Sequence, residues 1–135
     1  MLDNTSSSAD RTAQIICCDA EPDSRQKLTE KLTAFGYSVL ATGNPQIASG
    51  LLHEKPVGAL VVSMDRVKLS LVSVVVDARR TRPRLPIVVI LAAGTRDQIP
   101  PGLADIVLVN PTDSKLRSSL NAFVENNKRT LAAAC

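Results

Sequence analysis

Acidic and hydroxyl side chains follow three strongly apolar stretches of the sequence, in a pattern typical of a metal-assisted site. Asp19 and Glu21 come after the first stretch, Ser63 and Asp65 close the second, and Asn110 follows the third. If the stretches are parallel strands, their carboxyl ends share one edge of the sheet, where such folds bind ligands. Neighbouring carboxylates at that edge are the usual ligands of Mg²⁺.

Hydrophobic periodicity predicts the elements that position these residues. Short apolar runs predict strands at residues 14–18, 37–41, 59–62, 86–91 and 105–109. Helix-start signals occur at Pro22, at Asn44–Pro45 and at Pro111–Thr112–Asp113. Their expected core stripes are Leu28, Leu32 and Phe35; Ile47, Leu51 and Leu52; and Leu116, Leu120, Phe123 and Val124. Buried strands that alternate with amphipathic helices predict a parallel sheet covered on both faces.

The stretch from Leu69 to Val76 allows two interpretations. Its valines favour a strand, whereas Leu69, Val72 and Val76 stand at helical spacing. The alternation of elements requires a crossover at this point, so we interpret the stretch as a helix. By contrast, residues 94–102 contain Pro100–Pro101 and predict a helix that is short or missing.

Composition restricts the classes of function. The chain has two Phe, one Tyr and a net charge of +3, which argues against base-stacking platforms and direct nucleic-acid binding. The basic cluster at residues 79–84 is interpreted as a solvated helix end. Three cysteines, two of them adjacent, do not form a disulfide framework and favour a reducing cytoplasm. No apolar run has transmembrane length, so no membrane association is expected. The expected organisation is a disordered arm (1–12), one domain (13–127) and a flexible tail (128–135).

In order and spacing, four segments resemble the response-regulator receiver domain of bacterial two-component (phosphorelay) signalling. These segments are residues 15–25, 54–56, 85–89 and 102–111. The resemblance implies a doubly wound, flavodoxin-like α/β fold with five parallel strands in the order 2-1-3-4-5. The expected fold therefore has this sheet, with a fourth helix that is short or missing.

The functional positions of that family carry other residue types here. The first metal-binding acid is kept as Asp19, but the second falls on Ala20. The phosphoacceptor position falls on Ser63, the switch hydroxyl on Leu91 and the invariant lysine on Asn110. The resemblance also implies a cis-proline turn at Asn110–Pro111. These residues outline a degenerate phosphorylation pocket of the pseudo-receiver type.

These losses agree with one another chemically. A serine cannot form an acyl phosphate, and phosphoryl transfer needs metal and lysine charges to neutralise the phosphoryl oxygens. No triad or nucleophile–base pair is apparent, so no enzyme activity is expected. No cofactor is expected beyond weak Mg²⁺ at Asp19 and Glu21. A competing interpretation makes these two acids caps of the first helix.

The predicted function is therefore phosphorylation-independent signalling through protein–protein interaction. The expected partner is a histidine kinase, another regulator or a second copy of the chain in a homodimer. The expected interface comprises residues 95–108 with Lys115, Arg117 and Ser118. Two alternatives remain open: a conventional phosphoacceptor at Asp65, and a small-molecule sensor that uses the vacated pocket.

Overall fold

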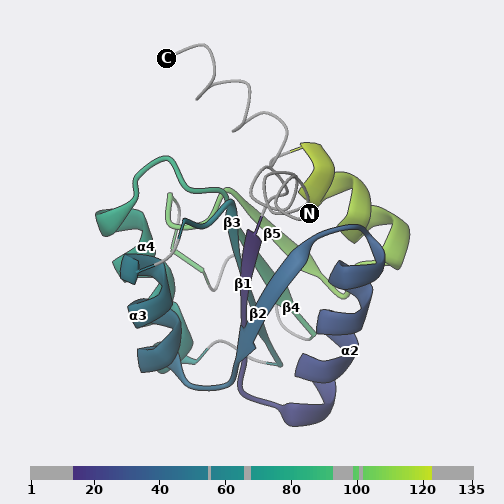
Figure 1. Ribbon diagram of the computed structural model, residues 1–135, viewed down its shortest axis with the longest axis horizontal. Helices are drawn as coiled ribbons and strands as arrows, with labels where there is room; N and C mark the ends of the chain where they lie inside the picture. Colours follow the sequence, from purple (N-terminus) through teal and green to yellow (C-terminus); the bar gives the residue numbers. More distant parts are fainter. Residues whose placement is uncertain (1–13, 55, 66–67, 93–98, 101, 123–135) are drawn as a thin grey trace, which may run out of the picture.

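The computed structural model describes residues 14–54, 56–65, 68–92, 99–100 and 102–122. Five parallel strands form one sheet in the order β2-β1-β3-β4-β5 (Figure 1). The strands are β1 (Gln14–Asp19), β2 (Ser38–Thr42), β3 (Ala59–Met64), β4 (Ile87–Leu91) and β5 (Ile106–Val109). The labelled helices are α2 (Pro22–Ala34), α3 (Pro45–Glu54) and α4 (Leu69–Thr81), and residues 113–122 are also helical. The predicted strand order is confirmed.

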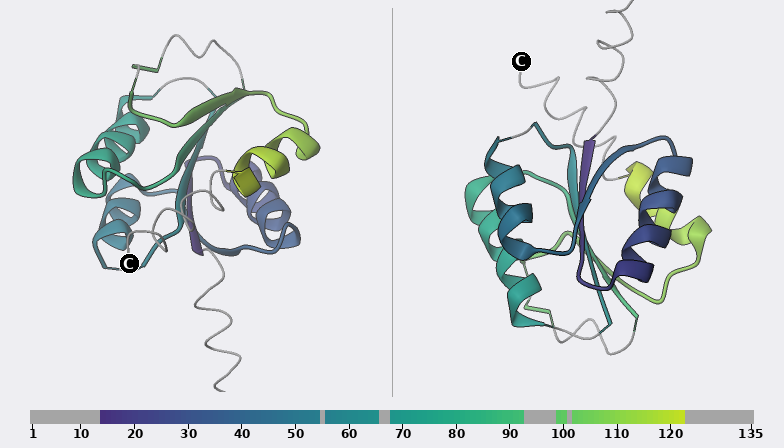
Figure 2. Two further views of the ribbon diagram at one scale, coloured as in Figure 1. Left: turned by 90° about the horizontal axis from the view of Figure 1, so that it is seen from above. Right: turned by 60° about the horizontal axis from the view of Figure 1, so that its bottom comes forward.

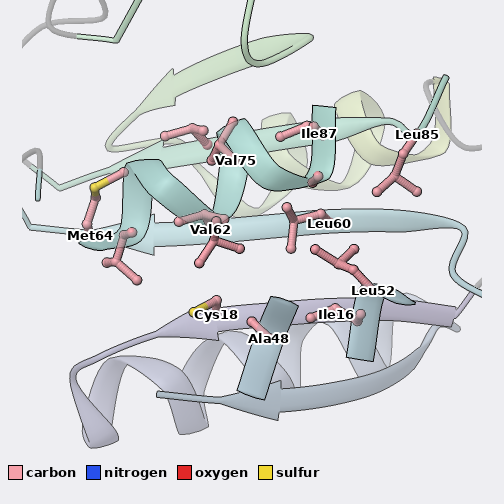
Figure 3. Close-up of a cluster of buried hydrophobic side chains, with 14 of the residues drawn as sticks. Ile16, Cys18, Ala48, Leu52, Leu60, Val62, Met64, Val75, Leu85 and Ile87 are labelled. Atoms are coloured by element: carbon pink, nitrogen blue, oxygen red, sulfur yellow. The ribbon is translucent and has the colours of Figure 1, made fainter. Parts of the chain in front are cut away.

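Helices cover both faces of the sheet. Helices α3 and α4 lie on one face, while α2 and helix 113–122 lie on the other (Figures 1 and 2). Successive residues along a strand point to opposite faces, so the core has two parts. Ile16 and Cys18 belong to the part under α3 and α4, which Figure 3 shows. Ile15 and Cys17 belong to the part under α2 and helix 113–122.

The ends of α2 follow local sequence rules. Pro22 occupies the first turn, where its missing N–H costs nothing. At the other end Gly36 has φ 103°, a left-handed conformation that favours glycine. The N–H of Gly36 donates to the Thr33 carbonyl (3.0 Å) and the N–H of Tyr37 to the Leu32 carbonyl (3.2 Å). This pair of bonds is a Schellman motif, which ends the helix and directs the chain into β2.

The prediction of a helix at α4 is confirmed, and of the three residues at helical spacing only Val72 packs against the core. Leu69 is 85% exposed and Val76 37% exposed. The buried stripe is instead Leu71, Val74, Val75 and Ala78. Asp77 on one flank of α4 contacts His53 of α3, and Arg79 on the opposite flank contacts the chain before β5. The burial of this apolar stripe fixes the rotation of α4 about its axis, and the two polar contacts lie on the flanks of the stripe.

A smaller correction concerns α3. Ile47, an expected core residue, is 53% exposed, whereas Ala48 is fully buried. Leu52 is fully buried as predicted, and Leu51 packs against the α3–α4 core. The alanine faces the sheet because a small side chain lets the helix approach β1 closely.

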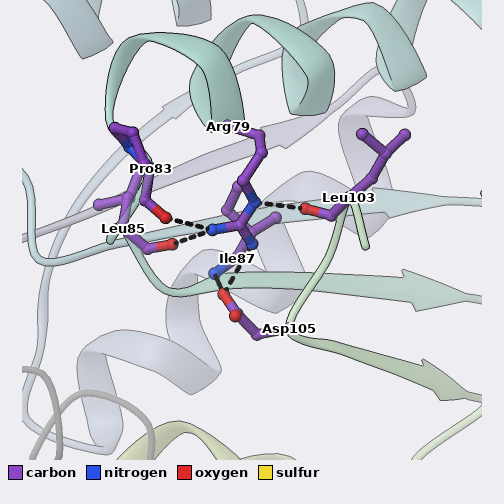
Figure 4. A network of polar contacts seen from close by, with 6 residues as sticks. All are labelled: Arg79, Pro83, Leu85, Ile87, Leu103 and Asp105. Carbon is purple, nitrogen blue, oxygen red and sulfur yellow. Dashed lines mark hydrogen bonds and ion pairs between the residues drawn. The ribbon is translucent and has the colours of Figure 1, made fainter. Parts of the chain in front are cut away.

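The connection between β4 and β5 contains no helical residue among those described there, namely 92, 99–100 and 102–105. Its end is held by the Arg79 side chain, which Figure 4 shows in contact with several main-chain oxygens. The guanidinium donates to the carbonyls of Leu103 (3.0 Å), Pro83 (2.8 Å) and Leu85 (3.4 Å) and to a carboxylate oxygen of Asp105 (3.0 Å). The same Asp105 oxygen accepts the Ile87 N–H (2.7 Å). We call this arrangement the Arg79 clamp. The interpretation of residue 79 as part of a solvated helix end is therefore wrong.

Several predictions lie outside the described residues. They are the arm (1–12), the tail (128–135), the core positions Phe123 and Val124, and part of the predicted interface (residues 95–98 and 101). Within the described part of the chain, no helix has the length and apolar character needed to cross a lipid bilayer.

Candidate functional site at the carboxyl edge of the sheet

A pocket of about 500 Å³ opens at the carboxyl edge of the sheet, between α2 and helix 113–122. We call it the edge pocket. Its lining residues are Glu21, Asp23, Ser24, Lys27, Leu28, Lys31, Ser63, Asp65, Ile90, Leu91, Ala92, Asn110, Pro111 and Leu116. The sequence predicted that the strand-end residues would converge, and Glu21, Ser63, Asp65, Leu91 and Asn110 do line one pocket. Asp19 and Ala20 do not line it.

The inner wall of the edge pocket is apolar. Leu28, Ile90 and Leu116 line it and belong to the α2-side core, where each is at most 9% exposed. Leu91 also lines the pocket, but it is fully buried and belongs to the core on the other side of the sheet. The residue at the predicted switch position is therefore a packing residue.

Asp19 is committed to the start of α2. It is 2% exposed, and each carboxylate oxygen accepts one hydrogen bond. The Glu21 N–H donates to Oδ1 (3.0 Å), and the Ser24 hydroxyl donates to Oδ2 (2.5 Å). Arg25 donates to the Asp19 carbonyl (3.0 Å). The carboxylate thus organises the turn into the helix. Glu21 occupies the N-cap position but makes no side-chain cap bond, so the expectation of a Glu21 cap is wrong.

The residues at this edge do not fit a divalent cation. Ala20 offers no carboxylate beside Asp19, and both Asp19 oxygens already accept protein hydrogen bonds. Among the described residues, no three Asp, Glu, His or Cys side chains are close enough together to hold a metal ion. A divalent cation requires several oxygen ligands at once.

Ser63 lies at the predicted strand end. It stands beside Asp19 in the register between β3 and β1 and is 9% exposed. Its hydroxyl makes no hydrogen bond within the described part of the chain and borders the edge pocket. The pocket therefore contains a hydroxyl that has no partner among the described residues and is open to solvent or to a ligand.

Two lysines of α2 also line the edge pocket, and the sequence analysis did not identify them as site residues. The ammonium group of Lys31 lies 3.0 Å from a carboxylate oxygen of Asp113. Lys27, one helical turn earlier, has no ion pair among the described residues. The available signal was their spacing of four residues around Leu28, which places both on the flank that faces helix 113–122.

The turn after β5 differs from its prediction. None of the described residues has a cis peptide bond, so the predicted cis-proline at Asn110–Pro111 is wrong. Asn110 adopts φ 48° instead, a left-handed conformation that asparagine tolerates better than most residues. Its N–H donates to the Leu91 carbonyl (2.7 Å), which ties the turn to the end of β4. The left-handed residue reverses the chain without a cis bond.

The two adjacent cysteines are unsuited to nucleophilic chemistry. Burial, reinforced by the nearby Asp19 charge, raises the pKa of Cys17 to about 12 and that of Cys18 to about 11. The thiolate is the reactive form of cysteine. Both thiols therefore remain protonated and act as small core residues.

Comparison with known proteins places the fold. A response regulator receiver domain protein from Clostridium thermocellum matches with a TM-score of 0.77 and 19% identity, over 87% of this chain and 98% of that one. A response regulator receiver protein from Sinorhizobium medicae matches with a TM-score of 0.75 and 21% identity, over 87% and 98%. The response regulator TrrA from Thermotoga maritima, solved with Mg²⁺ and BeF, matches with a TM-score of 0.75 and 19% identity, over 83% and 99%. No family model and no curated protein matches the sequence. The fold is the flavodoxin-like receiver fold.

Proposed function

We propose that this chain is an atypical receiver domain of two-component signal transduction that works by protein–protein interaction and without phosphorylation. The single observation that carries the proposal is the composition of the edge pocket. Ser63 replaces a carboxylate at the end of β3, and Asn110 places no cation after β5. The pocket keeps the position of a phosphorylation site without its chemistry.

The charges argue against phosphoryl transfer. The transferred group needs cations on its oxygens as it passes from donor to acceptor. Asp19 is fully engaged by the start of α2, and no described cluster of side chains could hold a metal ion. We therefore propose that Mg²⁺ binds weakly at most and that the chain has no enzymatic activity of its own.

The proposed partner is a histidine kinase, another regulator or a second copy of the chain, in the cytoplasm. The proposed interface uses helix 113–122 and β5, which is an edge strand of the sheet and pairs with β4 alone among the described strands. Val109 of β5 is 40% exposed, and Lys115, Arg117 and Ser118 are exposed on the helix. An open strand edge beside exposed basic side chains suits an acidic or strand-adding partner.

The test is incubation with acetyl phosphate and magnesium, followed by intact mass spectrometry. We expect no added phosphoryl group and no change in Tm with millimolar magnesium, because a ligand raises Tm only when it binds the native state. The matched control is a receiver domain that retains its acceptor aspartate, which must gain one phosphoryl group under the same conditions. A stable adduct on the present chain would contradict the proposal.

One alternative acceptor is favoured by a specific observation. Asp65 lines the same pocket as Lys27, so a carboxylate and a lysine share it after all. If an adduct forms, the variant Asp65→Asn decides its position. Loss of the adduct in this variant would identify Asp65 as a conventional phosphoacceptor.

A further inference from the structure

We propose that the edge pocket binds a small amphipathic organic amine, with its apolar body on the inner wall and its ammonium group at the acidic mouth. This inference goes beyond the proposed interaction function and does not depend on it. It gives the vacated pocket a chemical class of ligand.

The shape of the pocket suits a small organic molecule. Its volume of about 500 Å³ lies within the range of roughly 300–1,000 Å³ that is usual for small-molecule sites. Leu28, Ile90 and Leu116 form a continuous apolar wall from three separate elements. Such a wall gains free energy when it is covered by an apolar ligand body.

The charged side chains that line the pocket indicate the sign of the charge on the ligand. Three carboxylates, Glu21, Asp23 and Asp65, line the pocket, against the two ammonium groups of Lys27 and Lys31. Lys31 is already neutralised by Asp113, which does not line the pocket. The three carboxylates have no ion pair or hydrogen-bond donor among the described side chains. Three unpaired anions against one unpaired cation favour a positively charged ligand group.

Ser63 supplies an independent observation. Its side chain is about nine-tenths buried, lies on the α2 side of β3 as Val61 does, and has no described partner. No buried side-chain oxygen or nitrogen of the described residues lacks a hydrogen-bond partner, so the Ser63 oxygen is exposed to the pocket, where a ligand can take the place of solvent. Its oxygen can accept one N–H of an ammonium group, while Asp65 supplies the opposite charge.

The proposed positively charged ligand is an organic amine and not a metal ion. The carboxylates around the mouth do not form a group of three that could close on one ion, as judged from the described residues. An ammonium group needs only one or two acceptors at hydrogen-bond distance, and its apolar body uses the wall that a metal ion would leave uncovered.

The experiment compares three probes with the same body: phenethylamine, 2-phenylethanol and 3-phenylpropionate. Binding is measured by titration calorimetry and located by amide chemical-shift changes in the full chain. We expect phenethylamine to bind at least tenfold more tightly than the alcohol, because it adds a charge-assisted hydrogen bond. The carboxylate should not bind, and the shifts should centre on Ser63, Asp65 and Ile90.

Variants locate the amine. Asp65→Asn should weaken phenethylamine about tenfold, and Ser63→Ala should weaken it severalfold. Glu30→Gln removes the same charge from the exposed part of α2 outside the pocket and should change nothing. The proposal is overturned if no probe binds, if the carboxylate binds more tightly than the amine, or if Asp65→Asn and Glu30→Gln have equal effects. None of these outcomes bears on the phosphorylation test, which uses no amine.

Discussion

At the scale of single residues, Ser63 and Asn110 line the same pocket, and we predict that a charge at one of them affects the other. A carboxylate at residue 63 would stand beside the buried Asp19 and face no lysine at residue 110. We expect Ser63→Asp to lower the free energy of unfolding by about 1–3 kcal/mol, since it places a second carboxylate beside the buried carboxylate of Asp19. Urea denaturation measures this loss, and Ser63→Asn controls for size.

The same measurement tests the pairing directly. In the Ser63→Asp background, Asn110→Lys should restore about 1 kcal/mol through the new ion pair, relative to its effect in the parent chain. The parent comparison is needed because lysine at the left-handed φ of residue 110 carries its own strain. An interaction energy near zero in this double-mutant cycle would mean that the charges at residues 63 and 110 do not interact.

The buried thiols give a pH dependence. Unfolded cysteines ionise around pH 9.0, while Cys18 and Cys17 in the folded chain stay protonated until about pH 11 and 12. The unfolded state therefore binds fewer protons above pH 9, and folding stability falls as pH rises. We expect a loss of about 1 kcal/mol per thiol between pH 8 and 10.

Urea denaturation across this pH range, in a Cys135→Ser background, checks the dependence on the two thiols. The double variant Cys17→Ala/Cys18→Ala should be less stable at neutral pH because it leaves cavities. Its stability should nevertheless fall less steeply above pH 9. Equal slopes in both proteins would assign the alkaline loss to lysine and tyrosine groups.

At the scale of elements, the Arg79 clamp joins α4, the turn before β4 and the chain before β5. Its guanidinium is mostly buried and donates to four acceptors, three of them main-chain carbonyls. Arg79→Ala should cost about 2–3 kcal/mol of unfolding free energy, and Arg79→Lys should recover little, because one ammonium cannot reach the same fork of acceptors.

Chemical denaturation again provides the measurement, with Arg80→Ala as the matched control. Arg80 is the exposed neighbour on α4, and its removal should change stability by less than about 0.5 kcal/mol. If both alanine variants lose the same free energy of unfolding, the contacts of the Arg79 clamp do not stabilise the fold more than an exposed arginine does.

Sequence reasoning located the elements and the buried faces of α2 and helix 113–122, but not the buried face of α4. Every predicted strand is present in the structure, and so is every predicted helix within the described residues. They could be predicted because apolar runs, prolines and Gly36 mark their boundaries. The segment of α4, however, contains two apolar stripes, and only contacts with other elements decide which one is buried. The buried stripe is the one that packs in the core below α3 and α4, and the Asp77–His53 and Arg79–Asp105 contacts lie on its flanks. No local pattern contains this information.

The candidate site was predicted only in part, because the sequence indicates where strands end but not which flanks of the helices face each other. Ser63, Asp65 and Asn110 converge because strand ends must share an edge. Lys27, Lys31 and Leu116 come from helices, whose facing flanks depend on how the helices pack. The hydrogen bonds that occupy Asp19 depend on the rotamer of Ser24, which periodicity does not reveal.

At the scale of the whole molecule, the open edge of β5 and helix 113–122 form the proposed interface. Arg117, which lies 5.8 Å from the centroid of the Phe35 ring, and Lys115 are exposed there. We expect Lys115→Glu/Arg117→Glu to weaken self-association or capture of an acidic partner at least tenfold, since each reversed charge becomes repulsive. Sedimentation velocity over a concentration series reports self-association.

The control is Lys68→Glu/Arg80→Glu, an equal charge reversal on exposed positions of α4. It should leave association unchanged. If the parent chain and both variants stay monomeric at all concentrations and capture the same partners, the interface lies on another surface.

The division of the interior by the sheet has a consequence for sequence variation. Cys17 and Cys18 are neighbours in the chain, yet each packs with a different set of side chains. Substitutions that repack one half should therefore combine additively with those that repack the other. Substitutions can therefore accumulate independently in the two parts of the core. The part under α2 can change to accommodate a new ligand while the part under α3 and α4 keeps the domain folded.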